Sequence, residues 1–82
     1  MDTSLKDLLV YIVRELVDEP DAIDVREIPS EDGSETTLEL RVAKEDMGKV
    51  IGRQGRIARE LRTIMRSAAN HRDTRVSVEI CD

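Results

Sequence analysis

The feature that most constrains this chain is a pair of glycines, Gly52 and Gly55, that enclose two polar residues, Arg53 and Gln54. Apolar residues at helical spacing lie on both sides of this tetrapeptide, so the sequence predicts two helices joined by a tight loop. Glycine tolerates positive φ and has no Cβ, so such a loop can present backbone N–H groups to another molecule. The second helix begins just after Gly55, and the unpaired N–H groups of its first turn favour an anion, with a phosphate as the obvious candidate.

Charged and apolar residues flank the loop. Lys49 precedes it by one turn and Arg56 follows it, so both add positive charge near Arg53. Apolar side chains lie on both sides of the loop, at Val50, Ile51 and Ile57. A surface of this kind could accept flat bases without aromatic stacking.

The basic residues are concentrated in one part of an acidic chain. Residues 1–48 carry 14 acidic and 5 basic side chains. Residues 49–72 carry 1 acidic and 7 basic side chains, and residues 73–82 carry 3 acidic and 1 basic. The overall net charge of −5 therefore hides a central segment with a net charge of +6. An anionic partner responds to this local field rather than to the sum. A solvated, arginine-rich helix face without a partner is the alternative explanation.

Composition argues against several classes of function. Tyr11 is the only aromatic residue, which disfavours RNA sites built on base stacking, such as the RRM or OB-fold surface. A single histidine, His71, leaves no second histidine for a metal site, and a single cysteine, Cys81, excludes an internal disulfide and a cysteine-only metal cage. No apolar run approaches the roughly 18 residues that span a membrane, and no signal peptide is recognisable. We expect a non-enzymatic protein of the cytosol with no cofactor, metal, small-molecule substrate or membrane association.

Hydrophobic periodicity predicts an α+β fold with the element order helix, strand, strand, helix, helix, strand. The three strands can form one sheet whose apolar face is covered by the helices. The first helix has Thr3 and Ser4 as candidate caps, and Ile28 breaks the alternation of the first strand, which indicates a bulge or bend. The helices are expected over Thr3–Asp18, Asp46–Ile51 and Arg56–Asn70, and the strands around Ile23–Ile28, Leu38–Val42 and Val76–Ile80.

The longest helix is predicted to have two separate faces. Its core face comprises one arc of about 60° with two flanking residues: Ile57, Leu61, Ile64 and Ala68, with Ala58 and Met65 beside them. Its basic face lies opposite: Arg59, Arg62 and Arg66, with Arg56 beside them. Arg62 and Arg66 are farthest from the glycine loop, so a solvated position is expected for both.

The run from Val50 to Ile57, which reads V-I-G-R-Q-G-R-I, resembles the V-I-G-x-x-G signature of the KH domain. This RNA-binding module uses its GXXG loop to clamp the backbone of about four nucleotides. The element order is similar to the type II, prokaryotic KH arrangement, which has a mixed sheet. The wider stretches 45–58, 61–63 and 75–80 resemble the small single-KH proteins of bacteria, the KhpA type. The resemblance covers essentially the whole chain, so residues 1–82 are expected to be one KH domain.

The resemblance also implies roles for individual residues. Gly52 and Gly55 would hold the loop shape, while Arg53 and Gln54 would meet the RNA phosphates. The base groove would be lined or supported by Val50, Ile51 and Ile57, and flanked by Lys49, Arg56 and Arg59. Plain core packing is the alternative role for the three apolar residues. A groove for nucleic acid further requires that nearby carboxylates point elsewhere, namely those of Asp24, Glu27, Glu31 and Asp32.

The ligand implied by the resemblance is single-stranded RNA. One such site binds weakly, so a second RNA-binding unit is expected, either in a homodimer or in a larger KH-containing partner of the KhpB or Jag type. The resemblance implies a role in RNA regulation linked to cell elongation and division. The alternative is a protein-interaction module with a KH fold and little intrinsic RNA affinity. The acidic segment 1–48, with a net charge of −9, favours this alternative because it could bind a basic partner.

Overall fold

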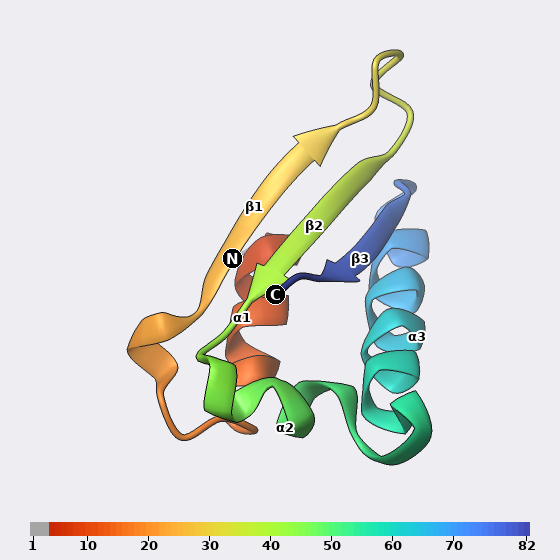
Figure 1. The fold of residues 1–82 in the computed structure, drawn as a ribbon. Coiled ribbons are helices and arrows are strands. Elements are labelled where there is room, and N and C mark those ends of the chain that lie inside the picture. The colour runs from red at the N-terminus through yellow and green to blue at the C-terminus, as the bar shows by residue number, and fades with distance from the viewer. Residues whose placement is uncertain (1–3) are drawn as a thin grey trace.

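The computed structural model describes residues 4–82, which form three α-helices and one three-stranded sheet (Figure 1). The helices are α1 (Leu5–Arg14), α2 (Met47–Ile51) and α3 (Arg56–His71), and the strands are β1 (Asp24–Pro29), β2 (Thr36–Arg41) and β3 (Val76–Ile80). Short 3-10 turns lie before β1, before α2 and between α2 and α3, at Pro20–Ala22, Lys44–Asp46 and Arg53–Gly55. This order confirms the predicted α+β fold. Within residues 4–82, no helix has the length and hydrophobicity that crossing a bilayer requires.

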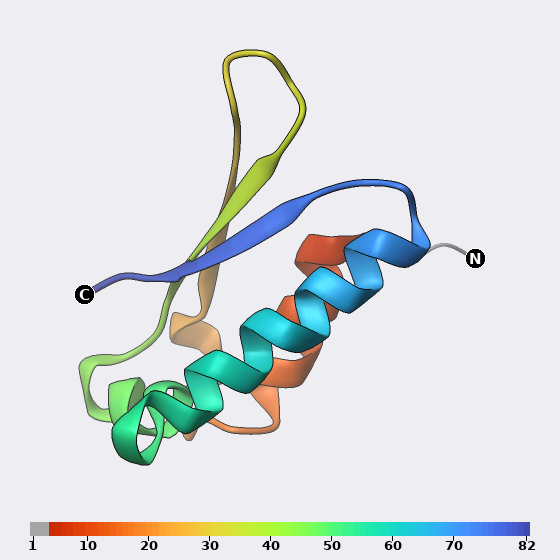
Figure 2. The same cartoon turned by 90° about the vertical axis from the view of Figure 1, so that its right-hand side faces the viewer.

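Strand β2 lies at the centre of a mixed sheet. It pairs antiparallel with β1 and parallel with β3. The parallel pairing follows from the path of the chain, because α2 and α3 carry it from the end of β2 back to the start of β3. Alternate residues of each strand face the helices. Figure 2 shows that α1 and α3 cover the same face of the sheet, whereas the opposite face is open.

The hydrophobic core lies between the sheet and the helices. Its least accessible apolar side chains come from both layers: Leu9, Val13, Leu38, Leu40, Val50 and Met65. Val25 and Val78 extend this core to the two outer strands. The alternation predicted for all three strands therefore positions their apolar residues as expected.

The core face of α3 is rotated relative to the predicted one. Leu61 is buried as expected, but Ile64 is 44% exposed, and Ile57 and Ala68 are only half-buried. The remaining buried positions of α3 are Ala58, Met65 and Ala69. The predicted arc followed the largest apolar side chains. In the structure the helix instead packs along a face containing two buried alanines, where small side chains let α3 come close to its neighbours.

Helix α1 is shorter than predicted. It ends at Arg14 rather than Asp18, and the chain then turns, because the N–H groups of Leu16 and Val17 both donate to the carbonyl of Val13. Its N-cap is Ser4, whose Oγ accepts the N–H of Asp7 at 3.0 Å. The other candidate cap, Thr3, lies outside the described residues.

The bulge predicted near the end of β1 is wrong. Pairing with β2 continues without interruption from Asp24 opposite Arg41 to Pro29 opposite Thr36. Ile28 therefore stays in register but points to the open face of the sheet, where it is 44% exposed. The break in the apolar alternation reflects an apolar residue on the open face rather than a change in backbone geometry.

Candidate nucleic-acid interface

The glycine loop depends on both of its glycines in different ways. Gly52 has φ 76° and ψ 172°, a region accessible almost only to glycine, and a Cβ at this position would lie 2.7 Å from Cγ1 and 2.9 Å from the backbone N of Ile57. Gly55 is left-handed at φ 73° and ψ 15°, but a Cβ there would meet no atom within 4 Å. Gly52 is thus required both for its backbone conformation and for the close contact with Ile57, whereas Gly55 is required for its backbone conformation alone.

The two central residues of the loop are presented to solvent. The N–H of Gly55 donates to the carbonyl of Gly52 at 3.1 Å and closes the turn, and Arg53 and Gln54 are both exposed at its tip. Gln54 is itself left-handed, with φ 57° and ψ 27°. One guanidinium nitrogen of Arg59 lies 3.4 Å from the carbonyl of Gln54, to which it donates. The loop is therefore held in a defined shape from both ends.

Helix α3 begins directly behind this loop with a positive end that no side chain neutralises. Its N-cap, Gly55, offers no side-chain hydrogen bond, and the first turn contains no acidic residue. The first N–H groups of an α-helix have no partner within the helix and carry the positive end of its dipole. Arg53 and Arg56 add formal charge at the same place, as predicted from the sequence.

A row of exposed arginines continues from the loop along α3. Its members are Arg53, Arg56, Arg59, Arg62 and Arg66. Within residues 4–82, none of these guanidinium groups forms an ion pair with a carboxylate. Arg56 and Arg66 are separated by about 15 Å along the helix axis, given the rise of 1.5 Å per residue. The row is a continuous strip of uncompensated positive charge.

Lys49 does not belong to this strip. Its Nζ donates to the carboxylates of Asp18 and Asp46, the latter at 3.1 Å. The hydrogen bond with Asp18 is the main cause that raises the pKa of Lys49. Lys49 was expected to flank an RNA groove, but its charge is instead compensated within a network that ties α2 to the segment after α1.

Asp46 is the buried centre of that network. Its two carboxylate oxygens accept the backbone N–H groups of Asp18 and Glu19, at 3.2 and 3.0 Å. Burial opposes ionisation of Asp46, yet the hydrogen bonds from Asp18, Glu19 and Lys49 outweigh it, so that its pKa lies below the usual value. Sequence reasoning missed this role because the partners lie 27 and 28 residues away.

The apolar residues next to the loop divide between core and surface. Val50 is completely buried and supports the loop from the core. Ile51 is 37% exposed, and Ile57 is half-buried against Gly52. Of these three residues, Ile51 and Ile57 therefore offer apolar surface beside the glycine loop.

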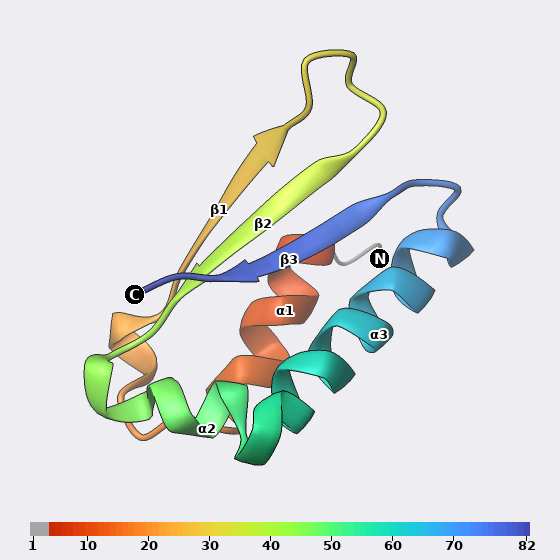
Figure 3. The ribbon, with the colours of Figure 1, turned by 45° about the vertical axis from the view of Figure 1, so that its right-hand side comes forward.

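A cleft lies between α3 and the free edge of β3. The two elements run side by side in Figures 2 and 3. Arg62 spans the cleft, because its Nε donates to the carbonyl of Val78 at 3.2 Å. Arg62 and Arg66 line a hollow of about 260 Å³ there, so both take part in the cleft rather than in a purely solvated face. The sequence could not show this, because it does not reveal which strand edge lies next to the basic face.

None of the four carboxylates expected to point away from the groove lines the hollow in the cleft. Asp24 and Glu27 lie on β1, at the sheet edge opposite β3 (Figure 1). Glu31 and Asp32 lie in the β1–β2 loop. Asp32 accepts hydrogen bonds from the backbone and hydroxyl of Ser34 and from the hydroxyl of Ser30, and these lower its pKa to about 2. A further acidic residue, Glu35, does line the cleft.

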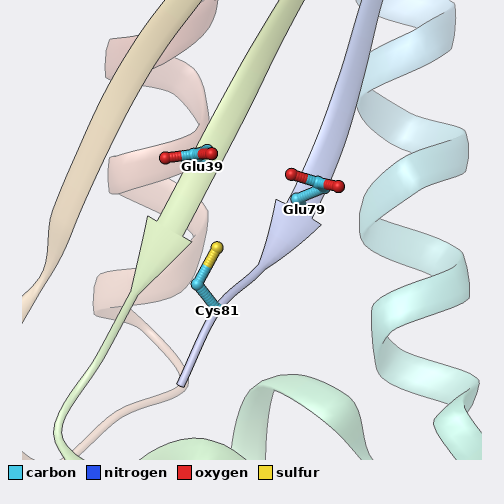
Figure 4. Close-up of side chains that lie close together, drawn as sticks. All are labelled: Glu39, Glu79 and Cys81. Carbon is cyan, nitrogen blue, oxygen red and sulfur yellow. The ribbon is translucent and has the colours of Figure 1, made fainter.

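A separate cluster lies on the open face of the sheet. Glu39, Glu79 and Cys81 bring one potential ligand atom each to within 4.8 Å of the others (Figure 4). A guanidinium nitrogen of Arg41 lies 3.7 Å from the carboxylate of Glu39 and compensates part of its charge. This cluster is on the face opposite to the helices and takes no part in the cleft.

Comparison with known proteins identifies close relatives. A model of the KhpA/KhpB KH domain matches residues 6–80. The "RNA-binding protein KhpA" of Treponema pallidum is 50% identical to this chain over 82 residues, which cover 100% of both chains. The "RNA-binding protein KhpA" of Clostridium acetobutylicum is 51% identical over 76 residues, which cover 93% of this chain and 99% of the relative. Among solved structures, Aquifex aeolicus Era bound to GDP.AlF4- matches with a TM-score of 0.55 and 22% identity over 98% of this chain and 31% of Era. A second Era structure, in complex with MgGDPNP and nucleotides of 16S ribosomal RNA, matches with a TM-score of 0.57 and 24% identity, over 96% of this chain and 31% of that chain. At this identity, the likeness to Era shows the fold alone.

Proposed function

The chain belongs to the KhpA/KhpB KH-domain family and has the type II KH fold, and on that premise we propose that it binds single-stranded RNA through its GXXG loop and the basic face of α3. The observation that carries this proposal is the unpaired arginine row, which starts at a loop shaped by two left-handed glycines. Its relatives in Treponema and Clostridium bear the name RNA-binding protein, which agrees in chemistry with that surface.

The proposed contacts follow from the geometry of the loop. Phosphates of about four nucleotides pass the exposed Arg53 and Gln54 and the uncapped start of α3. Arg56 and Arg59 flank this path with fixed positive charge. Bases turn toward the apolar surface of Ile51 and Ile57, whose side chains are accessible beside the loop. Val50 and Lys49 act indirectly, by packing and by bracing α2.

The test is a fluorescence-anisotropy titration of a short single-stranded RNA at two salt concentrations. Arg53→Asp should weaken binding strongly and reduce its salt dependence, because it removes a phosphate contact and adds repulsion. Arg26→Asp makes the same charge change on β1 and is the matched control. Equal binding by both variants, with circular dichroism unchanged, would contradict a role for the loop.

A second RNA-binding unit is part of the proposal. Non-specific contact with one site gives dissociation constants of the order of 10⁻⁴–10⁻⁶ M, and linking two sites raises the overall affinity. The unit is a second copy of this chain or a larger KH-containing protein of the KhpB type, acting in RNA regulation linked to cell elongation and division. Analytical ultracentrifugation of the protein alone, and then with RNA, measures whether two copies act together.

The alternative function is a protein-docking module. The exposed carboxylates of β1 favour it, because Asp24 and Glu27 lie at the sheet edge away from the arginine row. The anisotropy titration separates the two functions. If the wild-type protein binds no RNA at either salt concentration, the docking function becomes the better explanation.

A further inference from the structure

The cleft between α3 and β3 contains an acidic residue at the end away from the glycine loop. Glu35 immediately precedes β2 and lines two adjoining hollows of about 260 and 210 Å³. Both hollows share Glu35, Arg66 and Val76. The first is completed by Arg62, Ser77 and Val78, and the second by Ala69, Asn70 and Arg75. The shared lining makes them one groove that continues the arginine row.

The backbone holds Glu35 in a fixed position beside this groove. Its N–H donates to the hydroxyl of Ser30 at 3.2 Å, and its carbonyl accepts the N–H of Ser30 at 2.8 Å. The next residue, Thr36, donates its N–H to the carbonyl of Arg75 at 3.1 Å and so joins this point to the start of β3. A side chain that starts from such a constrained backbone can discriminate between ligands.

The groove offers one strong acceptor among several donors. In the part of the chain that the structure describes, Glu35 forms no ion pair with Arg66 or Arg75, although all three line the same hollow. An ionised carboxylate only accepts hydrogen bonds, and a guanidinium only donates them. A phosphate would suit the arginines but not Glu35. The complementary ligand therefore presents a donor and an acceptor side by side.

A nucleobase with an exocyclic amino group has that pattern. Cytosine offers its N4 amino group as a donor, with N3 and O2 as neighbouring acceptors, and adenine and guanine also combine an amino group with ring acceptors. Uracil carries a carbonyl where cytosine carries the amino group, and that oxygen would face the carboxylate. We propose that Glu35 accepts a hydrogen bond from the exocyclic amino group of a base in this groove, so that the protein prefers cytosine to uracil there. This inference rests on the proposed RNA binding.

The test compares the affinities of oligocytidine and oligouridine for three proteins: the wild type, Glu35→Gln and Glu31→Gln. Glutamine keeps the size of glutamate but can donate to the uracil carbonyl. Glu35→Gln should therefore reduce the preference for cytosine over uracil by roughly tenfold, the lower part of the range for base-specific contacts. Glu31 lies in the same loop, outside the hollows, and its substitution makes the same charge change. Glu31→Gln should leave the ratio of the two affinities unchanged.

Two outcomes would overturn the inference, and they differ in what they say of RNA binding. In the first outcome, the wild type binds RNA and Arg53→Asp abolishes this binding, but Glu35→Gln and Glu31→Gln change the affinities for oligocytidine and oligouridine equally. Glu35 then acts only through its charge, and the proposed function stands. If the wild type binds neither oligonucleotide, the proposed function fails and the inference fails with it.

Discussion

Replacing Gly52 by alanine should destabilise the fold by about 1–5.5 kcal/mol. The backbone conformation at φ 76° and ψ 172° costs a residue with a Cβ about 1–3 kcal/mol. The new Cβ would also lie 2.7–2.9 Å from three atoms of Ile57, one of them its backbone N, and overpacking of this kind costs about 1–3 kcal/mol. The lower chain entropy of unfolded alanine offsets about 0.4–1 kcal/mol of this loss.

The matched control for this experiment is Gly55→Ala. Gly55 is also left-handed, but its Cβ would meet no atom within 4 Å, so only the conformational cost of about 1–2 kcal/mol applies, reduced by the same entropic offset as for Gly52→Ala. Urea denaturation followed by far-ultraviolet circular dichroism measures the loss of stability of both variants. In thermal denaturation, the Tm of Gly52→Ala should fall by at least roughly 4 °C. If Gly55→Ala were as destabilising as Gly52→Ala, the contact with Ile57 would not constrain the loop and the reasoning would be refuted.

Three further predictions concern the core face of α3, Lys49 and Asp46. Met65→Ala should cost about 2–5 kcal/mol in the same denaturation assay, whereas Ile64→Ala should cost less than about 1 kcal/mol, and equal losses would contradict the observed core face of α3. Lys49→Met should lower stability with little change in RNA affinity. Arg56→Met should instead weaken RNA binding and reduce the slope of log affinity against log salt concentration by about 1. If Lys49→Met weakened RNA binding and Arg56→Met did not, Lys49 would belong to the interface. The pKa of Asp46 is lowered in the folded protein, so its stabilising effect is complete above the unfolded pKa of about 3.9 and is lost as the pH falls through the folded value. Asp46→Asn should therefore flatten the acid side of the plot of stability against pH. An unchanged plot would contradict this role of Asp46.

The sequence was sufficient to predict features that depend on neighbouring residues. Period-two alternation placed Leu38, Leu40 and Val78 on the covered face of the sheet, and Ser4, one of the two candidate caps, is the N-cap of α1. The glycine spacing also predicted a loop between two helices, because positive φ at Gly52 and Gly55 is a local requirement. Each of these features is determined by interactions among residues that are close together in the sequence.

Features that depend on contacts across the fold could not be predicted in this way. The rotation of α3 depends on which face lets the helix pack closely, so Ile64 stayed outside although it is more apolar than Ala69. Lys49 looks identical in sequence to a phosphate-binding lysine, but Asp18 lies 31 residues away and becomes its partner only in the folded chain. The position of Glu35 could not be predicted, because no feature of the neighbouring sequence places the residue before β2 next to α3.

The distribution of charge explains how an acidic chain can present a surface for an anion. The sheet separates the carboxylates of β1 from the arginine row, because Asp24 and Glu27 lie at one edge whereas α3 lies beside β3 at the other. At physiological ionic strength, the Debye length is about 8 Å, so exposed carboxylates at the far edge weaken the field at the arginine row only slightly. The compensated pair of Lys49 and Asp46 adds little to that field. The excess of negative charge can therefore keep the chain soluble while the row on α3 determines which partner approaches it.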